Sequence, residues 1–144
     1  MKVNKIVPIL VLFVCFVLFS CSSNESPEIE KTANINIDVS PNPIVLIWYP
    51  SLSCCVGQFK VTVTETGGQR CTLSNVKAIF HHNGSDYESA TNAGGAIAAF
   101  GSFETAFEVL TVYAYSQIRV SAEGGDPSGH SVDKSKVFNV SYVY

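Results

Sequence analysis

The sequence predicts an all-β protein, a single antiparallel β-sandwich of seven or eight short strands, and three observations lead to that class. Apolar and polar residues alternate with a period of two over several short segments, as in strands with one buried face. Turn-forming residues such as glycine, proline and asparagine separate these segments. β-Branched and aromatic residues, which favour strands, are concentrated in the same segments. Short strands with turn signals between them are typical of a sandwich.

The first strands follow from this alternation. Residues 35–39 alternate strictly, whereas residues 44–49 are apolar on both faces and predict a fully buried strand. In residues 59–64 every second residue is apolar, and Gly67-Gly68 then turns the chain. Residues 76–80 repeat the alternation. The sequence therefore predicts a strand, a Gly-Gly turn and a second strand in the middle of the chain.

The second half is less uniform. Residues 118–122 alternate, residues 124–129 are rich in turn formers, and residues 137–144 close the domain as a last strand. In Ile97–Leu110 the apolar residues stand three or four apart, which is also the spacing of an amphipathic helix. Gly101 and Ser102 interrupt that pattern, and the flanking segments are strand-like. We favour strands here, with a helix as the alternative.

Two segments resemble known β-domains. FKVTVTETGGQRCTLSNVKAIF is similar to the central hairpin of bacterial immunoglobulin-like domains. IRVSAEGGDPSGHSVDKSKVFNVSY is similar to their last two strands, with residues 126–129 in the connecting turn. The resemblance implies an immunoglobulin-like sandwich used for display, spacing or binding, and it carries over no functional residue. The cysteine–tryptophan–cysteine order of antibody domains is absent, because Trp48 precedes the cysteines of the folded part.

The amino end carries a short apolar segment behind a charged start. Lys2 and Lys5 precede residues 6–19, a run of 14 residues that is apolar except for the helix-breaking Pro8. A membrane-spanning helix needs about 20 residues, so the segment is typical of an export signal. A plain signal peptide or a short membrane anchor is the alternative.

Residues 18–21, Leu-Phe-Ser-Cys, resemble the lipobox of bacterial lipoproteins, in which the chain is cut before a cysteine that carries diacylglycerol. The CSSNES that follows is similar to the polar tether of lipoproteins from the Bacteroidetes. The resemblance implies a signal peptide over residues 1–20 and a Cys21 carrying two or three acyl chains, palmitate among them, which anchor stably. Because Ser22 follows Cys21 instead of an aspartate, the outer membrane is the expected location, with the domain in the periplasm or on the cell surface.

The remaining chain divides into a tether and one folded domain. Residues 22–31 are polar and predict disorder, so residues 21–32 are the lipidated tether and residues 33–144 the sandwich. Loss of Lys2 and Lys5 leaves seven basic residues against twelve acidic ones, a net charge of −5. This balance argues against a nucleic-acid partner.

The three cysteines of the folded part are Cys54, Cys55 and Cys71, an odd number in an oxidising compartment. If Gly67-Gly68 centres a regular hairpin, Cys71 lies roughly 30 Å from Cys55, whereas a disulfide requires Cα atoms within about 7 Å. Cys54 and Cys55 are adjacent, so a disulfide between them would be small and strained.

The same hairpin would gather Cys54, Cys55, His81 and His82 at one end of the sheet. Two sulfurs and two imidazoles suit tetrahedral zinc, although neighbouring strand residues point to opposite faces. An envelope metal-handling protein that uses these four residues is therefore the alternative function. Two exposed histidines beside a strained disulfide is the simpler interpretation.

No motif of an enzyme or of a bound cofactor stands out, and a non-enzymatic, lipid-anchored display or binding module is the expected function. We expect partner contacts in two loops, residues 83–91 and 123–131, at the end far from the anchor. Their candidate residues are Asn83, Asp86, Tyr87, Asp126 and His130. The partner would be a protein or a glycan, while a purely structural spacer would have none.

Overall fold

The computed structural model describes residues 31–144, in which strands and turns are present and no helix occurs. The strands are β1 (Ile35–Ser40), β2 (Ile44–Tyr49), β3 (Cys54–Glu65), β4 (Cys71–His82), β5 (Ser85–Ala93), β6 (Ala96–Ile97), β7 (Ser102–Thr111), β8 (Gln117–Gly125) and β9 (Ser131–Val143). The predicted signal peptide, Cys21 and residues 21–30 of the tether lie outside the described residues. Within the described part, no helix could span a membrane.

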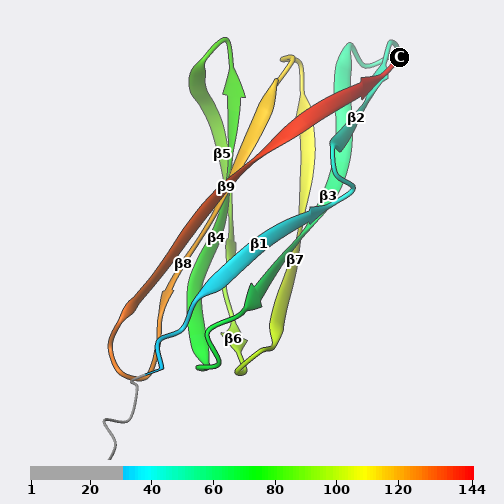
Figure 1. Cartoon of the computed structure of the whole chain (residues 1–144). Helices are drawn as coiled ribbons and strands as arrows, with labels where there is room; N and C mark the ends of the chain where they lie inside the picture. Colours follow the sequence, from blue (N-terminus) through cyan, green and yellow to red (C-terminus); the bar gives the residue numbers. More distant parts are fainter. Residues whose placement is uncertain (1–30) are drawn as a thin grey trace, which may run out of the picture. The chain divides into compact units, whose positions relative to one another are not determined.

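The strands pair into two groups that share β9 (Figure 1). In the first group β3 has β7 on one edge and both β1 and β2 on the other. In the second group β4 lies between β8 and the strands β5 and β6. The first part of β9 pairs with β8, and residues 140–143 then run beside β2. The long last strand therefore joins the two groups.

One apolar core fills the domain, and alternation explains which residues form it. Every second residue of β1 is buried, and the same pattern runs through β3 from Phe59 to Glu65. Val76 and Ala78 of β4 and Ile118 and Val120 of β8 come from the other group and are completely buried. Both groups contribute to a single cluster of buried side chains. The prediction of an all-β protein is thus confirmed.

Three details of the predicted topology are wrong. The described part contains nine strands instead of seven or eight, because most of residues 83–91, expected as a loop, belongs to β5. The pairing is not entirely antiparallel, since β2 and β9 run parallel. Finally, β3 and β4 do not form a hairpin: they belong to different groups, and the Gly67-Gly68 segment connects one group to the other.

Other expectations hold. Ile97–Leu110 contains the last residue of the short β6 and most of β7, so the favoured strand interpretation is correct there. β8 and β9 pair antiparallel along nine register positions, as their sequence suggested. By contrast, β2 is buried on one face only, because Ile47 and Tyr49 are 44% and 43% exposed.

The domain has two ends that differ in character (Figure 1). The described chain begins at the end that holds residues 66–70, 98–101 and 126–130, which we call the proximal end. The opposite, distal end holds residues 50–53, 83–84 and 112–116 and the carboxyl terminus. The long strands β3 and β4 each run from one end to the other.

Candidate functional site

The four residues of the predicted zinc site do not form a ligand set. Cys54 and Cys55 begin β3 in the first strand group, whereas His81 and His82 end β4 in the second. Nδ1 of His81 lies 2.8 Å from Oδ1 of Asp86, and Nδ1 of His82 lies 2.8 Å from the carbonyl oxygen of Ala114. Among residues 31–144, no three His, Cys, Asp or Glu side chains are grouped so that they could hold a metal ion.

The thiols of Cys54, Cys55 and Cys71 are free and buried, so the expected Cys54–Cys55 disulfide is not formed. Adjacent residues of a strand point to opposite faces, which separates the two neighbouring thiols. Cys55 belongs to the core, and burial, together with the neighbouring Cys54, raises the pKa of its thiol. A raised thiol pKa leaves little of the reactive thiolate at neutral pH.

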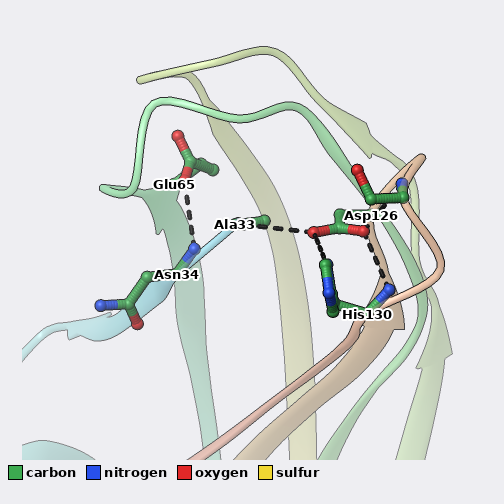
Figure 2. Close-up of polar contacts among 6 residues, drawn as sticks. Ala33, Asn34, Glu65, Asp126 and His130 are labelled. Carbon is green, nitrogen blue, oxygen red and sulfur yellow. Dashed lines mark hydrogen bonds and ion pairs between the residues drawn. The ribbon is translucent and has the colours of Figure 1, made fainter. Parts of the chain in front are cut away.

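We had expected Asp126 and His130 at the end of the domain far from the anchor, but this expectation is wrong. Both residues lie at the proximal end, next to the start of the described chain (Figure 1). The Asp126 side chain is completely buried. Its Oδ1 accepts hydrogen bonds from the backbone N–H groups of Ser128 and His130, at 2.9 and 3.0 Å. Its Oδ2 accepts from Nδ1 of His130 and from the N–H of Ala33, at 3.2 and 3.5 Å (Figure 2). Asp126 therefore organises its own turn and holds the start of the described chain.

Glu65 is a second buried carboxylate at this end, and it was not among the residues predicted from the sequence to be functional. Its Oε1 accepts from the N–H groups of Gly67 and Asn34, at 2.6 and 3.2 Å. Its Oε2 accepts from the N–H groups of Gly68 and Phe100, both at 2.9 Å. The bond to Asn34 is drawn in Figure 2. Only 1% of the residue is exposed, so four backbone donors take the place of water.

These hydrogen bonds explain why the Gly-Gly segment is not a hairpin turn. Gly67 and Gly68 direct their N–H groups back to Glu65, and Gly68 adopts a left-handed φ of 80° that favours glycine. The chain is thereby turned away from β3 and starts β4 in the other group. A signal was present in the sequence: Glu65 continues the alternation Phe59, Val61, Val63 and so falls on the inward face.

Both carboxylates are held in the charged form. Burial by itself would raise the pKa of Glu65, but the hydrogen bonds from the four backbone N–H groups lower it below its ordinary value. Burial would also raise the pKa of Asp126. Hydrogen bonds from the N–H groups of His130 and Ala33 and from the imidazole of His130 outweigh this effect, so the pKa of Asp126 is lowered overall. The proximal end is therefore most stable when both groups are ionised.

A shallow cavity of about 640 Å³ lies beside Asp126, and its lining also includes Arg70, Cys71, Ile97 and Pro127. Burial raises the pKa of the Cys71 thiol, and the charges of Glu65 and Asp126 raise it further. Cys71 is only 2% exposed. The Cys71 thiol is thus poorly reactive, and the Asp126 carboxylate is already bound by donors of the protein itself.

The distal end differs, because large apolar side chains are exposed there. Register places Val143, Ile47, Val56 and Leu110 side by side on one line across β9, β2, β3 and β7. Val143, Ile47 and Leu110 are 51%, 44% and 70% exposed. Four neighbouring strands therefore present aliphatic side chains on the outer face of the first group, where a strand normally places polar residues.

This row continues toward the tip of the domain. Leu52 and Val112 are 64% and 66% exposed, and together with Cys54 and Leu110 they line a hollow of about 500 Å³. Toward the proximal end the same outer face becomes polar, with the pairs Gln58–Glu108 and Lys60–Glu104 at 2.6 and 3.1 Å. We call the following residues the distal apolar face: Ile47, Tyr49, Leu52, Val56, Leu110, Val112 and Val143.

Of the predicted partner-binding residues, Asn83, Asp86 and Tyr87 do lie at the distal end, and all three are exposed. They belong to a hairpin and not to a long loop, since Asn83-Gly84 forms the turn and β5 begins at Ser85. The Asp86 carboxylate pairs with the side chains of His81 and Arg119. The Tyr87 ring packs beside the rings of His82 and Tyr113.

No protein-family model and no curated protein matches the chain. Solved structures show a similar fold. A crystal structure from Bordetella pertussis that carries the name ApaA is 13% identical with a TM-score of 0.60, covering 76% of this chain and 96% of that one. The X-ray structure of a structural-genomics target is 14% identical with a TM-score of 0.56, covering 75% and 86%. At these identities the likeness concerns the fold alone.

Replacement of Glu65 tests its role at the proximal end. Glu65→Gln removes the charged acceptor and turns an amide N–H₂ toward backbone donors, so we expect the free energy of unfolding at pH 7 to fall by about 1.5–3 kcal/mol. Because the pKa of Glu65 is lower in the folded state, its stabilisation is present above the unfolded pKa of about 4.3 and is lost as the pH falls through the folded pKa. Urea titrations of both proteins across this pH range measure the difference.

The matched control is Glu104→Gln, which changes an exposed carboxylate on β7. We expect that variant to stay within about 0.5 kcal/mol of the wild type. Equal stability of Glu65→Gln and the wild type at pH 7 would contradict the role assigned to Glu65.

Proposed function

We propose that the protein is a lipid-anchored envelope protein whose immunoglobulin-like β-sandwich binds a partner protein through the distal apolar face. The observation that carries the proposal is the row of exposed aliphatic side chains across four strands. Contiguous exposed apolar surface of this kind marks interaction sites in soluble domains. The proposal is of a binding module without enzymatic activity.

The chemistry of this face favours a protein over other occupants. Its exposed aliphatic row spreads over four strands, beyond the hollow of about 500 Å³ at its tip. A small molecule in that hollow would leave most of the row uncovered, whereas a protein surface can cover the whole row. An apolar centre with a polar border is the usual composition of a protein interface, and the border here carries Glu104 and Glu108. Their carboxylates oppose docking on an anionic lipid surface, which attracts basic residues.

The position of the face agrees with an anchor at the amino end. The described chain starts at the proximal end, where Glu65 and Asp126 hold it through Asn34 and Ala33. A membrane anchor attached there through a short tether leaves the opposite end pointing outward. Lipidation at Cys21, with residues 1–20 removed and residues 21–32 as the tether, is the anchor that we propose, in the outer membrane.

The alternative function, metal handling by Cys54, Cys55, His81 and His82, finds no support in the geometry. Both histidine side chains have protein partners through Nδ1, and the two thiols lie on opposite faces of β3. The purely structural spacer does not account for the exposed aliphatic row, because a spacer gains solubility from a polar surface.

The anchor is tested by Cys21→Ser in the native organism. We expect the wild type in the membrane fraction and the variant in the soluble fraction or still carrying its amino-terminal segment, as judged by immunoblot and intact mass. Membrane retention of a fully processed Cys21→Ser protein would contradict the lipid anchor.

The face is tested by photo-crosslinking in intact cells. A benzoylphenylalanine placed at Leu110, which is 70% exposed, should give one discrete protein adduct, whereas the same probe at Thr62, on the polar half of the outer face, should give none. A doubly charged variant, Ile47→Asp with Val143→Asp, should abolish the adduct from position 110.

Three outcomes would contradict the proposal that a partner protein binds the distal apolar face. An adduct of twice the chain's own mass would indicate self-association, and adducts only with lipid would indicate a membrane surface. Equal labelling from positions 110 and 62 would show that the face has no specific partner.

A further inference from the structure

A second distal site lies on the hairpin formed by β4 and β5, around a β-bulge. His81 and Phe80 are consecutive in β4, but they pair with residues 86 and 88 of β5, so Tyr87 is the extra residue. A bulge of this kind bends the strand and redirects the side chain of the extra residue, and bulges are frequent next to binding sites. The aromatic ring of Tyr87 is placed by this irregularity and not by the regular alternation.

Tyr87 belongs to a cluster of three rings. Its centroid lies 4.2 Å from that of Tyr113 and 5.9 Å from that of His82, and the centroids of His82 and Tyr113 are 5.6 Å apart. The imidazole of His82 is fixed at both nitrogens, by the carbonyl of Ala114 at 2.8 Å and the side-chain amide of Asn83 at 3.0 Å. Yet Tyr87 is 50% and Tyr113 37% exposed. The three rings therefore fix one another in position, and the cluster is nevertheless accessible to solvent.

Polar side chains converge beside this ring. A hollow of about 180 Å³ is lined by Tyr87, Asp86 and Ser89 of β5 and by Lys77 and Ile79 of β4. Oδ1 of Asp86 is held by Nδ1 of His81 at 2.8 Å and by Nη2 of Arg119 at 3.4 Å. Both contacts use the same oxygen, and 55% of the Asp86 side chain is exposed, so the carboxylate is accessible to a hydroxyl donor of a ligand.

We propose that this hollow binds a neutral hexopyranose, as a free sugar or as one unit of a glycan. Its volume is below the roughly 300–1,000 Å³ of sites for drug-sized ligands, which limits the ligand to about one ring. An aromatic ring offers an apolar surface for the C–H face of a pyranose, and this is the role of Tyr87. Asp86 accepts from a hydroxyl, while the Lys77 ammonium and the Ser89 hydroxyl donate. Because both signs of charge line the hollow, a neutral ligand fits better than an ionic one.

This site is separate from the distal apolar face. The residues that line its hollow belong to β4 and β5 of the second strand group, whereas the distal apolar face lies on strands of the first group and on the end of β9. The two are neighbours at Tyr113, which packs beside Tyr87 and also lines the hollow of about 500 Å³ in the distal apolar face. Sugar binding would stand even if no partner protein used that face.

The test is saturation-transfer difference NMR on the purified full chain with D-glucose, D-galactose, D-mannose and N-acetyl-D-glucosamine, each added alone. We expect at least one sugar to receive saturation, most strongly at the ring protons of one face. Tyr87→Ala should weaken its binding about tenfold through loss of the stacking surface. The matched control is Tyr144→Ala, which removes a tyrosine that is 92% exposed at the same end and should leave binding unchanged.

Asp86→Asn is the second variant, since it keeps the shape of the side chain while it removes the charge and replaces one acceptor oxygen with an N–H₂ donor. This variant should also bind the sugar more weakly than the wild type. The circular dichroism spectrum of each variant checks that the fold is intact. The proposal is overturned if none of the four sugars receives saturation at high millimolar concentration. It is equally overturned if a sugar binds the folded Tyr87→Ala and Asp86→Asn proteins as well as it binds the wild type.

Discussion

The buried carboxylate of Glu65 is the interaction on which the arrangement of this domain depends. Its two oxygens join the start of β1, the segment between β3 and β4, and the turn before β7 through four backbone N–H groups. A buried charge is costly unless donors surround it, and here the donors come from three separate segments. Loss of any one of them would leave the carboxylate short of a partner. The strands of both groups are thus tied together at the proximal end.

The proximal and distal ends of the domain differ in the side chains that they expose. Asp126 adds a second buried carboxylate and holds Ala33, so the first described residues are fixed to the domain and not loosely attached. The buried carboxylates of the proximal end are therefore engaged in hydrogen bonds within the domain. The distal end instead exposes aliphatic side chains on the first strand group and an aromatic cluster beside Asp86 on the second. Both features thus lie at the end of the domain opposite to the one where the described chain begins (Figure 1).

Local pattern predicted most strands and the pairing of β8 with β9, but not the pairing of β3 and β4. Alternation located β1, β3, β4 and β8 because each has one face in the core. It failed for the connection between β3 and β4, since a Gly-Gly pair does not reveal that its N–H groups bind a carboxylate instead of closing a hairpin.

The candidate sites show the same limit. The helix-like spacing in Ile97–Leu110 arose because Phe100 and Leu110 are exposed, which no periodicity predicts. The line from Ile47 to Leu110 depends on register between distant strands, and the role of Tyr87 depends on a bulge. Asp86 and Tyr87 were nevertheless selected from turn chemistry alone.

Amide hydrogen exchange measured by NMR on the native chain tests the central claim most directly. If Glu65 joins these segments, the N–H groups of Gly67, Gly68 and Phe100 will be strongly protected although they lie in turns. Their opening free energies should approach those of core amides in β3 and β4, because the bonds break only when the domain opens. Exchange of these amides at the rate of an unprotected loop, while the core remains protected, would contradict the account.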